Sequence, residues 1–318
     1  MSSKLRISLS CLLLTSLLFT TNTLPMAADG FVDVEEGDKY YVAITYLKEQ
    51  GIIDGYDDNT FRSSEDINRA EALKIITLAT ELFEEGEIEE PDGSIEEGED
   101  RPFTDTPLSA WYTPYLEEAK DRGIINGYED GSYKPDQTVK LVEALKIIQQ
   151  AAEISDFPEI TDENTFADAG VGFWYSEYVA YAKEHTLINV SASNGILPEQ
   201  ELTRGYLAEI IYRFLRRGEI EEFGKATFYG AAVQGNGTAS GETFDMNLHT
   251  AAHKTLPFGT MVKATNLANG KSVNVKINDR GPYGYGRVID LSSSAFEEIA
   301  WLGSGVIYVQ IEVVESPA

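Results

Sequence analysis

One pattern occurs three times in the first two thirds of the chain. Each unit opens with Phe-x-Asp, at residues 31–33, 103–105 and 166–168, and continues with a tyrosine and a helical spacing of apolar residues. The first two units then share a helix-ending glycine, Ile-Ile-x-Gly-Tyr, a turn-rich loop and a second helical segment. Glu71 and Glu143 stand at equal spacings from Tyr56 and Tyr128. This register match predicts repeated helix–loop–helix units, since self-similarity at a fixed period indicates a repeat architecture.

These units resemble surface-layer homology repeats over residues 31–217. The resemblance implies three repeats in a pseudo-threefold prism, with grooves that bind a secondary cell-wall polymer through a Thr-Arg-Ala-Glu motif. Arg69 and Arg204 occupy the arginine position of that motif, whereas Leu141 replaces it in the second unit. An arginine near a helix N-terminus suits an anionic sugar substituent, so Arg69 and Arg204 are the expected polymer-binding residues. Alternatively, they only pair with acidic neighbours.

The third unit is divergent. It has Ile188-Asn189-Val190 where the others carry Gly-Tyr, and Gly205 follows its arginine. The expected boundaries of the three repeats are 29–83, 102–155 and 156–218. Residues 84–101, rich in Asp and Glu with interspersed Pro and Gly, form an acidic insertion or linker. A calcium site there is conceivable, but the spacing of an EF-hand loop is absent.

Residues 1–28 have the pattern of an export signal. Lys4 and Arg6 precede an apolar run at 11–19, and Ala27 and Ala28 offer a cleavage zone. The run is too short to span a bilayer. We therefore expect an exported protein at the cell wall or envelope surface, with no membrane span in its mature form. Because the one cysteine lies inside the signal, no disulfide is expected.

The charge of the chain limits its partners. The formal net charge is −28, and most of the acidic excess lies before residue 219. A surface this acidic argues against nucleic acid or anionic lipid as a partner.

Residues 219–318 have the pattern of a small β-barrel. Strand-like runs at 261–266 and 272–278 flank Asn269-Gly270, a strong hairpin signal, and 306–314 is a further strand. A single short helix is expected at 293–300, with Asp290 as its N-cap.

Five ordered blocks mark this region. They are Ala-Thr-Phe-Tyr-Gly at 226–230, Thr-Ala-Ser-Gly-Glu-Thr-Phe-Asp at 238–245, Thr-Ala-Ala-His-Lys-Thr-Leu-Pro at 250–257, Asn-Asp-Arg-Gly-Pro at 278–282 and Arg-Val-Ile-Asp-Leu-Ser at 287–292. Together they resemble the double-psi β-barrel of rare lipoprotein A, a lytic transglycosylase family. The resemblance implies a multidomain fold class, with all-α pseudo-threefold repeats followed by an all-β six-stranded barrel.

Cleaving a glycosidic bond requires a proton for the leaving oxygen. A lytic transglycosylase then uses the 6-hydroxyl of the sugar as nucleophile, so one partly desolvated carboxyl group can act first as acid and then as base. Asp279 follows a β run and precedes a Gly-Pro turn, which makes it the best candidate; Glu242 is its partner. Alternatively, Asp279 pairs with Arg280 or caps a turn, and Glu242 is a solvated loop residue. The resemblance places the essential pair on Glu242 and Asp279, with Asp245 and His253 in support.

Other side chains are expected to bind substrate or to pack. Tyr229, Asn278 and Arg280 are the expected substrate-binding residues, and Tyr283 and Tyr285 either stack on sugars or lie in the core. No cofactor is expected. A zinc site is not expected either, because the predicted mature chain has no cysteine and this domain only two histidines.

The sequence thus predicts a wall-anchored lytic transglycosylase that cleaves MurNAc-GlcNAc glycan strands of peptidoglycan to 1,6-anhydro-MurNAc ends, held by its repeats at a secondary cell-wall polymer. Two alternatives remain: an expansin-like module that binds and loosens glycan without cleavage, and a structural envelope protein whose barrel is inactive. Fold alone does not separate them.

Overall fold

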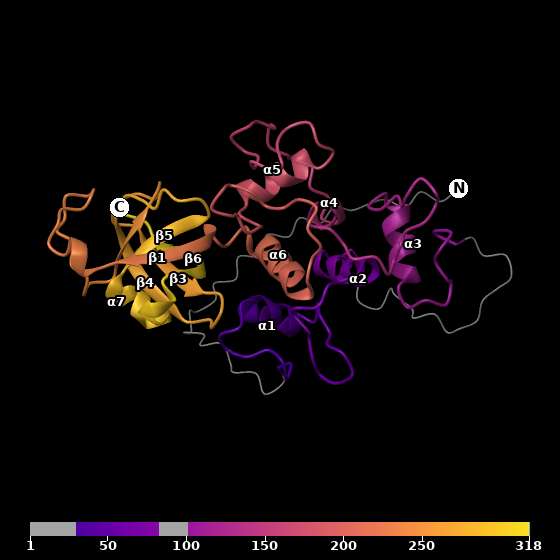
Figure 1. The fold of residues 1–318 in the computed structure, drawn as a ribbon, viewed down its shortest axis with the longest axis horizontal. Helices are drawn as coiled ribbons and strands as arrows, with labels where there is room; N and C mark the ends of the chain where they lie inside the picture. Colours follow the sequence, from indigo (N-terminus) through magenta and orange to yellow (C-terminus); the bar gives the residue numbers. More distant parts are fainter. Residues whose placement is uncertain (1–29, 83–100, 318) are drawn as a thin grey trace, which may run out of the picture. The chain divides into compact units, whose positions relative to one another are not determined.

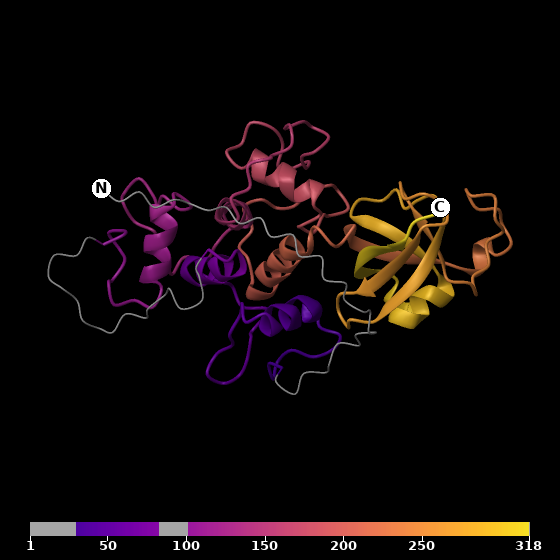
Figure 2. The same cartoon turned by 180° about the vertical axis from the view of Figure 1, so that it is seen from behind.

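The computed structural model describes residues 30–82 and 101–317. The predicted export signal and nearly all of the acidic insertion lie outside these residues. Six helices make up the described part before the barrel: α1 (Tyr41–Glu49), α2 (Arg69–Ala79), α3 (Thr113–Asp121), α4 (Leu141–Ala151), α5 (Ser176–Glu184) and α6 (Arg204–Arg216) (Figures 1 and 2). They alternate as the first and second helices of the three repeated units, as the sequence predicts.

An aspartate closes the loop of each unit in the same way. Its carboxylate accepts hydrogen bonds from two successive backbone N–H groups 28 and 29 residues further along the chain. The second of these residues has a positive φ in every unit, 58° at Arg62, 58° at Lys134 and 55° at Leu197. The three aspartates are Asp33, Asp105 and Asp168, so the third unit keeps this loop architecture although its sequence diverges.

The units meet around a triangle of backbone hydrogen bonds. The N–H of Ile67 donates to Leu202, that of Leu202 to Val139, and that of Val139 back to Ile67, at 2.9–3.1 Å. All three side chains are fully buried. The segments that precede α2, α4 and α6 therefore join around a pseudo-threefold axis, which confirms the predicted arrangement.

Replacing Asp105 tests the role of the loop aspartates. Asp105→Ala leaves the N–H groups of Tyr133 and Lys134 without their acceptor, so we expect the free energy of unfolding to fall by about 1–2 kcal/mol. Urea unfolding of the full chain measures this. Asp121→Ala, at an exposed position on α3, is the control. Equal unfolding midpoints for the two variants would contradict the assigned role.

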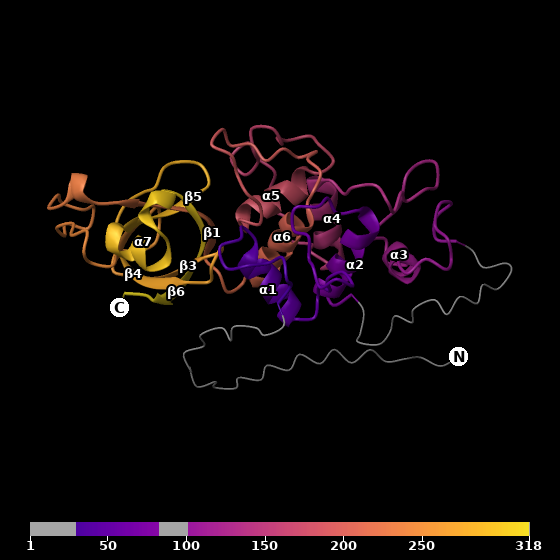
Figure 3. The same cartoon turned by 60° about the horizontal axis from the view of Figure 1, so that its bottom comes forward.

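The C-terminal region is a closed barrel of six strands with one helix. The elements are β1 (Glu222–Tyr229), β2 (Thr250–His253), β3 (Met261–Asn266), β4 (Ser272–Asp279), β5 (Arg287–Ser292), α7 (Ser293–Ile299) and β6 (Ile307–Glu315). The strand order is β1-β5-β2-β4-β3-β6, with β1 parallel to β5 and β2 parallel to β4. Figure 3 shows the strands as a ring. The predicted hairpin is β3 and β4, turning at Gly270 with a φ of 70°.

Alternation along the strands fills the barrel interior. In β4, Val273, Val275 and Ile277 are buried, and they join a core that includes Phe296 of α7. The polar positions between them point the other way. This alternation aims Lys276 at the outer surface where the 238–242 loop lies.

One local prediction is wrong. Asp290 does not cap α7, because pairing of β5 with β1 and β2 continues through residue 290. Asp290 instead accepts hydrogen bonds from Thr227 and Arg287. Ser292, the last residue of β5, is the N-cap and accepts from the N–H of Ala295.

The described residues from Phe31 onward form one compact unit in terms of their contacts. None of the helices in the described ranges 30–82 and 101–317 has the length and apolar character needed to cross a membrane.

Candidate functional sites

A loop of the second sequence block docks on the end of β4. The N–H of Ala239 donates to Asp279 Oδ1 at 2.9 Å, and the N–H of Ser240 donates to the carbonyl of Asn278 at 3.1 Å. The loop is closed by a bond from the N–H of Thr238 to the carbonyl of Glu242, 2.8 Å. Residues 40 positions apart are thereby joined, and the two candidate carboxylates lie at one edge of the barrel.

Glu242 is an ionised, exposed carboxylate in this arrangement. Its Oε1 lies 2.7 Å from Lys276 Nζ, and its Oε2 accepts from Asn278 Nδ2 at 3.0 Å. The hydrogen bond from Lys276, followed by that from Asn278, lowers the pKa of Glu242 below its ordinary value. Glu242 is therefore suited to stabilising positive charge, and Asn278, 2% exposed, acts by holding it.

Asp279 lies in a less exposed setting at the end of β4. It is half-buried, and its Oδ1 accepts from the N–H groups of Ala239 and Arg280, each at 2.9 Å. Because both donors face Oδ1, a proton on this carboxyl group belongs on Oδ2. The guanidinium of Arg280 donates instead to the carbonyls of His253 and Asp279, and it lies over the Phe258 ring at 3.7 Å. The alternative of an Asp279–Arg280 ion pair is not what the structure shows.

Tyr229 sits behind these carboxylates. Its ring packs against Phe244 at 4.5 Å, and its hydroxyl is buried next to Thr250. Burial raises the pKa of Tyr229, and the charges of Asp279 and Asp290 raise it further. The hydroxyl therefore remains protonated and can act as a donor toward the site.

The two residues expected in support brace the scaffold. Asp245 Oδ1 accepts from the backbone and side chain of Asn247 and from Gln234, and these bonds, the backbone one first, lower the pKa of Asp245. His253 is fully buried, and its Nδ1 accepts from the N–H groups of Thr255 and Leu256. Both side chains thus accept hydrogen bonds that close local turns, and His253 Nε2 lies 3.7 Å from Glu222.

The Lys276–Glu242 pair predicts a pH effect. If catalysis needs ionised Glu242, activity falls as pH drops through its lowered pKa, which lies below the ordinary 4.5. In Lys276→Met the main cause of that lowering is gone, so the acid limb of the pH–rate profile moves up toward 4.5. Rates measured across pH 3–7 test this, with Lys263→Met on β3 as control. An unmoved acid limb would exclude Glu242 as the group that titrates.

Lys276 was not among the residues selected from the sequence. The alternation of buried and polar residues in β4 indicates its position. Residues 274, 276 and 278 share the face opposite the buried valines. Sequence reasoning did not connect that face with the Glu242 loop. Tyr283 and Tyr285, for which two readings were open, are 84% and 60% exposed, which excludes the core.

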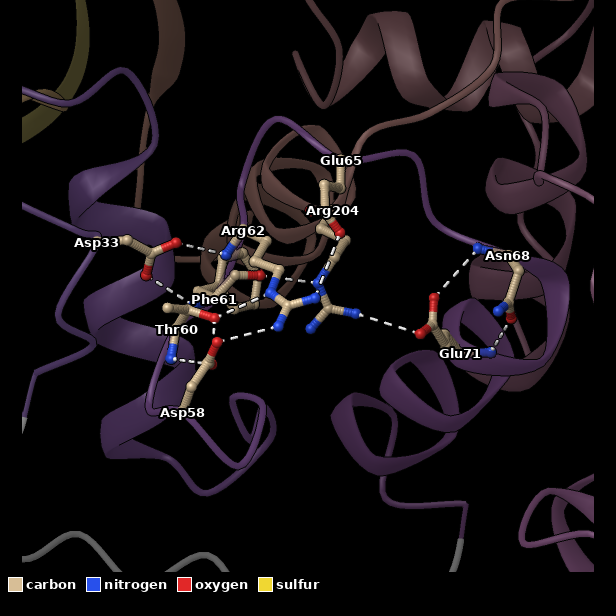
Figure 4. A network of polar contacts seen from close by, with 9 residues as sticks. All are labelled: Asp33, Asp58, Thr60, Phe61, Arg62, Glu65, Asn68, Glu71 and Arg204. Atoms are coloured by element: carbon tan, nitrogen blue, oxygen red, sulfur yellow. Dashed lines mark hydrogen bonds and ion pairs between the residues drawn. The ribbon is translucent and has the colours of Figure 1, made fainter.

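The two arginines of the repeats reach across to a neighbouring unit. Arg69 Nε donates to the carbonyl of Tyr133 at 2.9 Å, and its Nη1 lies 3.1 Å from Glu143. Arg204 makes the equivalent contacts with the carbonyl of Phe61, at 2.9 Å, and with Glu71, at 3.8 Å (Figure 4). The predicted pairing with acidic neighbours is therefore real. In each pair the arginine side chain is buried and the glutamate is partly exposed.

Aromatic rings flank each arginine. Arg69 lies over Tyr128 and Tyr133, at 5.2 and 4.5 Å from the ring centres, and it lines a hollow of about 200 Å³ with Trp174 and Lys146. Arg204 lies over Tyr56 and Phe61 at 4.8 and 4.9 Å. Tyr133 and Phe61 are fully buried, whereas Tyr128 and Tyr56 are partly exposed, and a cation beside a partly exposed ring can contact an anionic sugar.

The third position of the triangle, between α4 and α6, lacks both the arginine and the glutamate. Leu141 replaces the arginine at the start of α4, and Tyr206 of α6 stands where α2 and α4 have their glutamates. Both residues are buried. Neither partner of the ion pair is therefore present at this position.

Comparison with known proteins assigns the two parts to families. Residues 221–311 match the family model described as lytic transglycolase, and residues 30–73 and 102–144 match the model of the S-layer homology domain. The chain thus contains a C-terminal region that matches the lytic transglycolase family and two helical regions that match the S-layer homology domain.

Curated relatives agree with this assignment. The chain is 53% identical over 95 residues to "Probable endolytic peptidoglycan transglycosylase RlpA" of Treponema pallidum (strain Nichols), covering 30% of each chain. It is 55% identical over 92 residues to the protein of that name from Synechocystis sp., covering 29% of each. To "Endolytic peptidoglycan transglycosylase RlpA" of Neisseria meningitidis serogroup A it is 43% identical over 105 residues, 32% of this chain and 44% of the relative. The matches span less than half of each relative's length.

Proposed function

We propose that the barrel cleaves glycan strands of peptidoglycan as a lytic transglycosylase, leaving 1,6-anhydro-MurNAc ends. The observation that carries this proposal is the docking of the Glu242 loop on the end of β4, which puts an exposed ionised carboxylate beside a half-buried one. Two carboxyl groups in different environments are suited to different roles. The names of the curated relatives support the same reaction.

The hydrogen bonds to Oδ1 of Asp279 support a reaction in which Oδ2 carries the proton. Asp279 Oδ2 donates its proton to the bridging oxygen, and the C1–O bond breaks while Glu242 stabilises positive charge at C1. The 6-hydroxyl oxygen of the same sugar then bonds to C1, and its proton returns to Asp279. Water is neither consumed nor released, and Asp279 is restored. The Tyr229 hydroxyl donates to the substrate or to Asp279.

We further propose that the repeats hold the protein at a secondary cell-wall polymer, through the grooves of Arg69 and Arg204. Both are basic and aromatic sites on an otherwise acidic chain. Anchoring raises the local concentration of the barrel near its substrate without any new contact with it. The protein would then act at the envelope surface.

Digestion of purified sacculi tests this function. Sacculi with and without stem peptides are incubated with the full chain, and the soluble products are analysed by mass spectrometry. Anhydro-ended fragments from either substrate support the proposal, and the difference between the arms shows whether stem peptides block access. Binding to sacculi without soluble products would favour the expansin-like alternative.

A further inference from the structure

A second cavity lies where the third helical unit meets the barrel. Its volume is about 420 Å³. One wall includes the segment 186–190, which follows α5, and the other includes the loop 283–286 and the first residues of β5. That loop begins four residues after Asp279, so the cavity adjoins the segment that carries the proposed acid.

The walls of the cavity are held together by specific contacts. The N–H of Phe223 donates to Thr186 Oγ1 at 3.0 Å, and Lys225 Nζ donates to the carbonyl of Val190 at 3.3 Å. A Cβ added to Gly286 would lie 3.0 Å from the same carbonyl oxygen, at a φ of 68°. Val190 occupies the position of the glycine of Gly-Tyr in the other two units. Its carbonyl oxygen contacts the barrel at Lys225 and Gly286.

The side chains that line the cavity carry a net positive charge, opposite in sign to the charge of the whole chain. Five cationic side chains line it, from both walls, and Glu222 is the one acidic side chain among its lining residues. The cations are Lys183, Arg213, Lys225, Lys254 and Arg287. Glu209 and Asp290 pair with the two arginines, which leaves a positive excess. In a protein with a net charge of −28, such a site favours an anion.

Two buried donors in the lining lack acceptors. The Nε atoms of Arg213 and Arg287 have no hydrogen-bond partner within the described residues, and Arg213 is 1% exposed. The exposed rings of Tyr283 and Tyr285 also line the cavity and offer sugar-sized apolar faces.

We propose that this cavity binds a carboxylate-bearing sugar of the glycan strand on which Asp279 acts. The third unit is then a wall of the substrate site and not a further polymer-binding repeat. This inference rests on the proposed function for the identity of the strand, whereas the anion preference rests on the cavity alone.

Binding is measured on the full chain by calorimetry, with Asp279→Asn as the background so that cleavage does not interfere. The probes are N-acetylmuramic acid and its methyl ester, which differ by the carboxylate charge. We expect the free acid to bind at least fivefold more tightly. Equal affinities, or no binding of the acid, would overturn the proposal whether or not the protein cleaves glycan.

Isosteric variants locate the site. Asn194→Asp adds a negative charge on the wall from the third unit, at a φ of 60° that Asp tolerates, and should weaken binding about fivefold. Glu222→Gln removes the acidic lining group and should strengthen binding. Lys263→Gln, on β3 outside the cavity, should change nothing. Unchanged affinity in both cavity variants would contradict this location.

Two further readouts separate the glycan strand from the wall polymer as source of the sugar. In active protein, Asn194→Asp should raise KM for glycan strands several-fold, leave kcat unchanged and leave pelleting with cell walls unchanged. Reduced pelleting with an unchanged KM would assign the cavity to the polymer and overturn the proposal.

Discussion

Asp279→Asn is expected to lower the release of anhydro-muropeptides by about 100-fold or more, because a carboxamide cannot donate the proton that the leaving oxygen needs. The fold should survive. The amide oxygen of the asparagine can still accept from the N–H groups of Ala239 and Arg280, so the loop stays docked on β4. Product release is followed by chromatography with mass detection, and thermal unfolding is measured in parallel.

Glu297→Gln, an exposed change on α7 of the same barrel, is the control and should retain full activity. A fully active Asp279→Asn variant with normal unfolding would remove Asp279 from the chemistry. Loss of activity with loss of folding would instead be resolved by Asp279→Glu, which keeps the acid group and should restore part of the rate only if the acid itself is required.

The second large effect is expected in the wall-binding grooves. Arg69→Ala alone would leave Glu143 as an uncompensated, largely buried charge and would destabilise the fold. The double variant Arg69→Met with Glu143→Gln removes both charges while keeping the packing of the arginine stem. We expect it to weaken binding to purified cell walls about tenfold, since a charge-assisted contact with the polymer is lost.

Combining this change with Arg204→Met and Glu71→Gln should abolish pelleting, because these two grooves have the arginine and the third position has Leu141. The matched control removes the exposed Arg122–Glu118 pair of α3 by Arg122→Met with Glu118→Gln. Pelleting that is equal in all variants would show that these arginines serve packing alone.

Local sequence patterns predicted the elements that depend on interactions between residues close together in the chain. Asn269-Gly270 predicted the hairpin of β3 and β4, and Gly51 and Gly123 predicted helix ends, where the structure has φ values of 70° and 74°. The repeat register predicted the equivalence of the units, and the structure extends it to three loop aspartates.

What the sequence did not predict depends on contacts between distant segments. The sequence Val-Ile-Asp-Leu-Ser contains two possible N-caps for α7, Asp290 and Ser292. Because Asp290 is held in β5 by strand pairing, the N-cap is Ser292. The contact of Arg69 with the carbonyl of Tyr133 spans 64 residues. His253, expected in support of the catalytic pair, lies in β2 and is fully buried, which its local sequence does not indicate.

The central claim is that the 6-hydroxyl of the sugar, and not water, completes the cleavage that Asp279 begins. Digestion of sacculi in water enriched in heavy oxygen tests it most directly. The account predicts MurNAc ends that are one water lighter than hydrolysed ends and carry no heavy oxygen. Ends that contain heavy oxygen would show hydrolysis and would contradict the proposed mechanism.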